Sequence, residues 1–143
     1  MHVMILGNGG REHALAWKLS LSPMVESVHM APTGAHKPDN YVDAGVDPVD
    51  GQKVLRYVRE HDIQLVVIGP EAPLVAGVAD ILRTAGVPVF GPGKEAARLE
   101  GSKIFAKEFL QRHRIPTADF HVCTSQRQVK EVLKQLNRPM VVK

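Results

Sequence analysis

Apolar residues recur along this chain with two alternating periods, and no other feature of the sequence constrains its fold as strongly. Short apolar runs, which are typical of buried strands, lie at residues 3–6, 25–30 and 65–68 and in the segment VPVF. Between them, apolar residues at helical spacing predict helices at 11–21, 50–62 and 74–85. Strands that alternate with helices form parallel sheets with helices on both faces. The sequence therefore predicts an α/β fold with a doubly wound parallel sheet.

The pattern changes near residue 100, where the dipeptide GS interrupts a helical segment. Ser102 is a typical N-cap residue and predicts a helix over 103–113. The elements expected after it are a short strand at 120–123, a helix at 126–136 and a final apolar strand, MVVK. Residues 1–100 and 101–143 are thus predicted to be two domains. Because the second is near the lower size limit for independent folding, we expect it to be the truncated beginning of a domain.

Composition and charge exclude several classes of protein. Of the 143 residues, 44% are hydrophobic and 23% are charged, as in ordinary globular domains, so a disordered chain is excluded. The net charge of +3 comes from scattered basic residues and indicates no nucleic-acid partner. No apolar run reaches the roughly 20 residues of a membrane span, and the N-terminus lacks a signal-peptide pattern. With a single cysteine, Cys123, which is expected in a buried strand, these features favour a cytoplasmic protein.

The segment GNGGREHA joins the first predicted strand to the first predicted helix. A strand that ends in glycines and leads into a helix exposes backbone N–H groups and the positive end of the helix dipole. Such a turn binds anions, because glycine lets the backbone approach a phosphate, and the nearby Arg11 would add positive charge. The alternative is a tight packing corner that only turns the chain. The sequence leaves both interpretations open.

A dinucleotide site is disfavoured at this turn. The dinucleotide-binding pattern has glycine at its first, third and sixth positions and an acidic residue about 20 residues later. Gly7 and Gly9 fit, but the sixth position is Glu12, and no carboxylate ends the second predicted strand. We therefore do not expect an oxidoreductase that uses a nicotinamide cofactor.

Three further charged residues lie at boundaries of the predicted elements. Glu71 follows the Gly-Pro that ends the strand at 65–68, where it either holds an amine or a ribose hydroxyl or interacts with the dipole of the next helix. Lys103 and Lys143 begin a helix and end a strand; they either contact phosphates or are solvated, as most surface lysines are. The seven histidines show no metal-ligand spacing, so no metal site is predicted. Trp17 is expected in the core.

Four segments, in this order, resemble one family of enzymes: GNGGREHALAWKL, VVIGPEAPLVAG, FGPGKEAARLEGSKIFAKEFLQRHRIPTA and PMVVK. Together they are similar to the N-terminal part of the phosphoribosylamine–glycine ligases. The resemblance implies a Rossmann-like pre-ATP-grasp domain at residues 1–100 and the incomplete start of an ATP-grasp domain at 101–143. It also implies ATP-dependent ligation of glycine to 5-phosphoribosylamine through a glycyl phosphate, in purine biosynthesis, with ATP and magnesium or manganese as cofactors.

The resemblance also implies roles for individual residues. Lys103 and Lys143 match lysines that contact the phosphates of ATP, whereas no catalytic residue is assigned. One loop departs from the family: residues 31–38 read APTGAHKP where the family usually has APGNAGT, so the roles of that loop are not carried over. The residues that match the binding site for the phosphoribosyl substrate and glycine are Asn8, Gly9, Gly10, Arg11, Glu12, Glu71 and Pro73.

Because the ATP-grasp part is incomplete, we expect that these 143 residues are inactive alone and bind no cofactor. Phosphoribosylamine, glycine and ATP are the expected partners of the complete enzyme, without nucleic acid or membrane. The main alternative is a stand-alone phosphosugar- or nucleotide-binding module without catalysis. A further alternative is an interaction module that associates through an exposed strand edge of the second domain.

Overall fold

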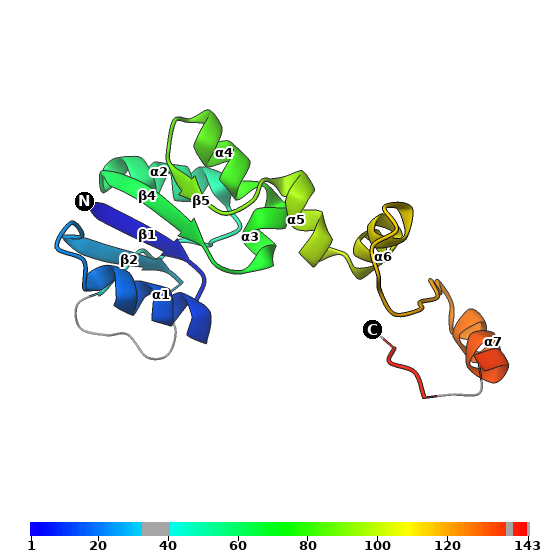
Figure 1. The fold of residues 1–143 in the computed structure, drawn as a ribbon. Coiled ribbons are helices and arrows are strands. Elements are labelled where there is room, and N and C mark those ends of the chain that lie inside the picture. Colours follow the sequence, from blue (N-terminus) through cyan, green and yellow to red (C-terminus); the bar gives the residue numbers. More distant parts are fainter. Residues whose placement is uncertain (33–40, 137–138, 143) are drawn as a thin grey trace. The chain divides into compact units, whose positions relative to one another are not determined.

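The computed structural model describes residues 1–32, 41–136 and 139–142 of the chain, which divides into two units, Met1–Gly101 and Ser102–Lys143. The first unit contains a sheet of five parallel strands in the order β3-β2-β1-β4-β5 (Figure 1). Its strands are β1 (His2–Leu6), β2 (Ser27–Ala31), β3 (Tyr41–Asp43), β4 (Ile63–Ile68) and β5 (Val89–Phe90). Its helices are α1 (Gly10–Ser20), α2 (Gly51–Glu60), α3 (Glu71–Ala76), α4 (Val78–Thr84) and α5 (Lys94–Gly101).

The strand order confirms the predicted α/β fold of the Rossmann-like type. The chain builds β1, β2 and β3 outward in one direction and then returns to place β4 on the other side of β1. Figure 1 shows α1 on one face of the sheet and α2 and α4 on the other. Because both faces are covered, the central strands are apolar along nearly their whole length, and this is why the sequence predicted them correctly.

Successive residues of β1 point into two separate cores. Met4 and Leu6 are fully buried in one core, which includes Val54 of α2 and Leu82 of α4. Val3 and Ile5 are fully buried in the core on the opposite face, against α1. This alternation is the period of two that a strand imposes on its side chains. β1 is therefore the strand on which the packing of both layers depends.

Helix α1 contacts the sheet through a narrow stripe. Ala16 is fully buried, and Leu15 and Leu19 pack against the same core at helical spacing. Trp17 lies off this stripe, and its side chain is 59% exposed, so the expectation that it belongs to the core is wrong. The periodicity of the helix, and not the size of the side chain, decides which residues are buried here.

The helix predicted at 74–85 is two helices. α3 and α4 meet at Gly77, which has a φ of +88°, a left-handed conformation that interrupts a continuous helix and that glycine adopts without strain. The predicted end of the second helix is confirmed: Gly86 has a φ of +82°, and its N–H donates to the carbonyl of Arg83 at 2.9 Å.

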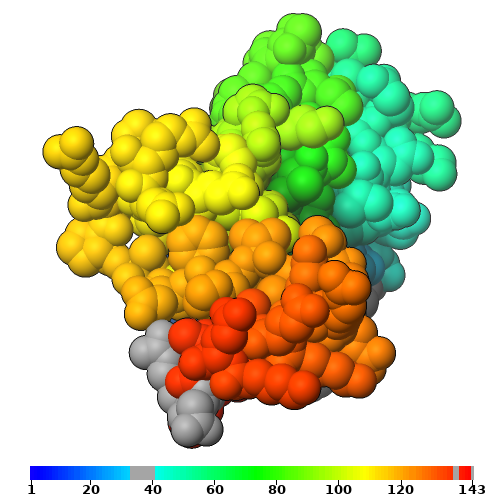
Figure 2. All heavy atoms as spheres, turned by 90° about the vertical axis from the view of Figure 1, so that its right-hand side faces the viewer, coloured from blue at the N-terminus to red at the C-terminus, as the bar shows by residue number. Residues whose placement is uncertain are grey.

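The second unit has two helices, α6 (Lys103–Arg112) and α7 (Gln126–Leu136), and neither contains a buried residue. Figure 2 shows this unit, in yellow to red, with its side chains open to the viewer. The predicted N-cap is confirmed, because the Ser102 hydroxyl accepts a hydrogen bond from the N–H of Phe105 at 3.2 Å. No helix in the described part of the chain is long and apolar enough to cross a membrane.

The strands expected in the second unit are absent from its described residues. Residues 120–123 and 140–142 form no strand, and Cys123 is only half-buried. An apolar run becomes a strand only when a neighbouring strand satisfies its backbone hydrogen bonds, and no described residue of 102–142 supplies one. The prediction of strands at these two places is therefore wrong.

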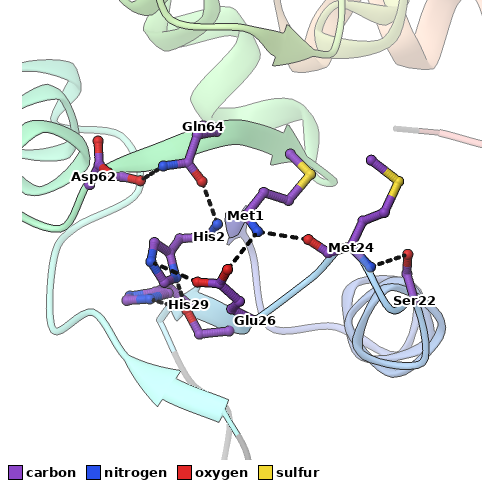
Figure 3. Close-up of polar contacts among 9 residues, drawn as sticks. Met1, His2, Ser22, Met24, Glu26, His29, Asp62 and Gln64 are labelled. Carbon is purple, nitrogen blue, oxygen red and sulfur yellow. Dashed lines mark hydrogen bonds and ion pairs between the residues drawn. The ribbon is translucent and has the colours of Figure 1, made fainter.

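A polar network lies beside the sheet at the start of β1 and β2 (Figure 3). His29 is buried; its Nε2 lies 2.8 Å from the Ser27 hydroxyl and its Nδ1 lies 2.9 Å from the Tyr57 hydroxyl. His2 contacts the same serine at 2.8 Å, and the ring of His61 stacks on Tyr57. Burial lowers the pKa of His29 below its usual 6.5, and the nearby His61 and His2 lower it further. Burial also raises the pKa of Tyr57, with a contribution from Asp43.

We expect this network to make the stability of the chain depend on pH. Because folding lowers the pKa of His29, the unfolded chain binds its proton first as the pH falls, so acid shifts the equilibrium toward unfolding. The free energy of unfolding should decrease as the pH falls below about 6.5, the usual pKa of histidine, by at most about 1.4 kcal/mol per pH unit from this one group. Urea titrations of the wild type and of His29→Phe measure the effect. Equal pH slopes for the two proteins would contradict the prediction.

The core on the α2 and α4 face should carry much of the stability of the first unit. Leu82 is fully buried there, and we expect Leu82→Ala to lower the free energy of unfolding by about 2–5 kcal/mol. Leu99→Ala is the matched control. This leucine lies on α5 and is 43% exposed, so the substitution should lower the free energy of unfolding by less than about 1 kcal/mol. Chemical denaturation followed by circular dichroism compares the two. Similar losses for both variants would refute the assignment of the core.

Candidate functional site

The candidate site lies where the neighbouring strands β1 and β4 end. The strand order reverses between these two strands, because β2 and β3 lie on one side of β1 and β4 lies on the other. Leu6 and Ile68 are paired as the last residues of these two parallel strands. The ladder continues for one residue beyond each strand: the N–H of Gly7 donates to Ala31 at 2.8 Å, and that of Gly69 donates to Leu6 at 3.1 Å. In open α/β sheets this position, between strands whose connections leave in opposite directions, is the crevice that binds ligands.

Glu12 is the buried acidic residue of this crevice, with only 4% of its surface exposed. Its Oε2 accepts a hydrogen bond from the N–H of Gly9 at 2.7 Å. Gly9 is the N-cap of α1 and Glu12 is the third helical residue, so the carboxylate satisfies a backbone donor that the helix leaves unpaired. Sequence reasoning identified Glu12 as a departure from the dinucleotide pattern but did not find that it is buried.

Three glycines make room for the Glu12 side chain. A Cβ on Gly7 or on Gly9 would lie 2.7 Å from its atoms, and a Cβ on Gly69 would collide with Oε1 and lie 2.5 Å from Cγ. Each of these distances is too short for a real contact. Of the two interpretations that the sequence left open, the packing corner therefore accounts for Gly7 and Gly9. Anion binding at this turn remains a prediction.

Arg11 ties α1 to the turn after β4. Its side chain is exposed, and Nη1 donates to the carbonyl of Gly69 at 2.9 Å. The carbonyl of Gly69 is thus bonded to Arg11, and the Cα of Gly69 lies against the Glu12 side chain. The N–H groups of Gly10 and Arg11, in the first turn of α1, have no hydrogen-bond partner among the described residues. These two amides and the guanidinium are the positively polarised groups at the crevice.

The other residues predicted for the site lie in different surroundings. Asn8 is exposed in the same turn, and Glu71 is exposed as the first residue of α3. Pro73 is fully buried, so its side chain packs inside the first unit. Lys103 is exposed as the first residue of α6 in the second unit. Lys143 lies outside the described residues, and so do residues 33–38 of the loop that differs from the family sequence.

Gly69 is the residue of this site that sequence reasoning missed. It lies between β4 and α3 in the Gly-Pro break, and only the pairing of β4 with β1 brings it beside Glu12. The Gly-Pro break at the end of β4 was visible in the sequence, but from it we predicted a role only for Glu71 and not for Gly69. Within residues 1–32, 41–136 and 139–142, no group of three His, Cys, Asp or Glu side chains is arranged to hold a metal ion.

The chain is similar in sequence to ligases from several bacteria. The chain is 46% identical over 145 aligned residues to the phosphoribosylamine–glycine ligase of Pasteurella multocida, 44% to that of Escherichia coli K12, and 49% to that of Streptomyces coelicolor. In each case the match covers 100% of this chain and 34% of the relative. The chain therefore spans about a third of the length of these relatives.

Solved structures share its fold at lower identity. A biotin carboxylase domain of a single-chain bacterial carboxylase matches with a TM-score of 0.64 at 18% identity, covering 95% of this chain and 34% of that one. A structure described as glycinamide-RNase-transformylase T from Mycobacterium tuberculosis matches with a TM-score of 0.62 at 23% identity, covering 93% and 38%. The family described as phosphoribosylglycinamide synthetase, N domain, matches residues 1–100. The chain belongs to this family.

Proposed function

We propose that this chain is the N-terminal part of an ATP-dependent ligase that joins glycine to 5-phosphoribosylamine. The products would be glycinamide ribonucleotide, ADP and phosphate, and glycyl phosphate would be the intermediate. The observation that carries the proposal is the 44–49% identity, over the whole chain, to three relatives named phosphoribosylamine–glycine ligase. The single cysteine, which forms no disulfide, is compatible with action in the cytoplasm.

In this proposal the crevice of the first unit binds the phosphoribosyl substrate. The amides of Gly10 and Arg11 and the Arg11 guanidinium would hold the phosphate, since they are donors at the positive end of α1. The N–H of Gly9 is already bonded to Glu12, so this glycine contributes by shaping the turn. Asn8 and Glu71 are exposed near the ends of β1 and β4 and would contact the sugar, its amine or glycine.

ATP would supply the phosphoryl group that activates the carboxylate of glycine. Lys103 is the described residue of the second unit that we propose to face the phosphates of ATP, with Lys143 as its expected partner. An ammonium group suits this role because negative charge builds up on the oxygens of the transferred phosphoryl group. The described residues contain no metal-binding cluster, so we assign the magnesium ion to none of them.

Arg11→Ala in the full-length enzyme tests the phosphate site. If Arg11 binds the phosphate in the ground state, the substitution should raise the KM for phosphoribosylamine by about tenfold or more and change kcat little. Lys18→Ala is the control, because Lys18 is exposed at the opposite end of α1. Steady-state kinetics of both variants, with their thermal unfolding as a check of folding, provide the comparison. An unchanged KM in Arg11→Ala would remove Arg11 from the substrate site.

The purified 143-residue chain tests whether the ligase activity resides in a longer protein. We expect no phosphate release that depends on both ATP and glycine, because the described second unit has no sheet and no buried residue to form a nucleotide site. The full-length enzyme, assayed in parallel, should release phosphate. Release by the short chain at a comparable rate would show that the ligase needs nothing more. Binding of a phosphosugar without release by either protein would favour the stand-alone module.

A further inference from the structure

We infer that Glu12 determines which ligands the crevice accepts: its free carboxylate oxygen, Oε1, accepts a hydrogen bond from an N–H or O–H group of the ligand. The ligand class is then a sugar phosphate with a donor group apart from its phosphate, and not a bare anion. The inference rests on the proposed function, because it takes the ligand of this crevice to be a phosphoribosyl compound.

The first support is that Glu12 uses only one of its two oxygens within the protein. Oε2 bonds to the N–H of Gly9, whereas no described residue donates to Oε1. No polar side-chain atom that is fully buried lacks a partner in the described part of the chain, so the unbonded Oε1 must reach the surface. The rest of the residue is buried, with 4% of its surface exposed. Capping of α1 explains one oxygen and leaves the other for a ligand.

The second support is the close confinement of the carboxylate. Gly7, Gly9 and Gly69 surround the side chain so closely that a methyl group on any of them would collide with it. The bond from Gly9 fixes the orientation of the carboxylate within this space. A hydrogen-bonding group that is held in place before the ligand arrives loses little conformational entropy on binding. Oε1 is therefore a preorganised acceptor at the ends of β1 and β4.

The third support is charge. Arg11, the adjacent cation, donates to Gly69 and forms no ion pair with Glu12 among the described residues. A carboxylate accepts hydrogen bonds and repels phosphate, which is also an acceptor. A phosphate must then bind away from Oε1, at the amides of Gly10 and Arg11, while an amine or hydroxyl of the same ligand lies at Glu12. One side of the crevice thus selects a donor and the other an anion.

Glu12→Gln in the full-length protein tests this assignment with three probes: inorganic phosphate, ribose 5-phosphate and glycinamide ribonucleotide. The amide oxygen of the substituted side chain would replace Oε2 as the acceptor for Gly9, so the amide nitrogen would point into the crevice and present a donor in place of an acceptor. We expect both sugar phosphates to bind roughly tenfold or more weakly, and inorganic phosphate to bind equally well or more tightly. Calorimetric titration measures all three affinities.

The controls separate recognition from structure. Glu60→Gln changes an exposed glutamate on α2 and should alter none of the affinities. Gly69→Ala places a methyl group against Oε1, displaces the carboxylate, and should weaken the sugar phosphates as Glu12→Gln does. Thermal unfolding of each variant reports on folding. A merely structural role of Glu12 would weaken all three probes alike, and that result would overturn the inference.

The outcomes also distinguish this inference from the proposed function. If the wild type binds neither sugar phosphate, the proposed function fails at this crevice and the inference fails with it. If the wild type and Glu12→Gln bind both sugar phosphates equally, the inference fails and the proposed function stands. If Glu12→Gln loses more affinity for glycinamide ribonucleotide than for ribose 5-phosphate, the donor is an N–H group of the ribonucleotide. An equal loss assigns it to a hydroxyl that both ligands carry, and either result supports the inference.

Discussion

The hydrogen bond from Gly9 to Glu12 is the interaction on which the geometry of the first unit depends at the crevice. It satisfies the N-cap of α1 and fixes where that helix begins after β1. The same side chain fills the space above Gly69, so it sets how closely the turn after β4 approaches the turn after β1. A buried carboxylate in this position is tolerated because the backbone supplies a donor to it. One residue therefore couples a helix start to two adjacent strand ends.

The sequence was sufficient to predict the sheet wherever a strand is buried on both faces. β1 and β4 are continuous apolar runs, because helices cover both sides of the sheet, and such runs are easy to recognise. β3 was not predicted, since Tyr41 is buried but the next two residues are exposed, which leaves no run to detect. The runs at 120–123 and 140–142 look like strands in the sequence, yet the described second unit offers them no neighbouring strand. An apolar run in the sequence predicts a buried segment, but the segment forms a strand only where a neighbouring strand pairs with it.

The candidate site was predictable only in part, for a related reason. The glycine-rich turn, Arg11 and Glu12 are close in sequence, so their shared location followed from the predicted strand and helix. The contact of Arg11 with Gly69 joins residues that are 58 positions apart, and it exists only because β4 lies beside β1. No short sequence pattern predicts the contact between Arg11 and Gly69. The burial of Glu12 follows from the same pairing, because Gly69, which follows β4, lies against its side chain.

If Oε1 of Glu12 binds a ligand as we infer, the same residue serves both the packing of the first unit and recognition. The glycines and the bond from Gly9 confine the carboxylate, so in our inference a ligand would have to fit the crevice largely as the protein folds it. The amides of Gly10 and Arg11 and the carboxylate of Glu12 belong to the same first turn of α1, so the backbone of that turn limits their spacing. In our inference, selectivity in this crevice would arise from the arrangement of a donor region at the start of α1 and an acceptor at Glu12. A ligand that carries only negative charge would then meet one favourable region, whereas a sugar phosphate would meet both.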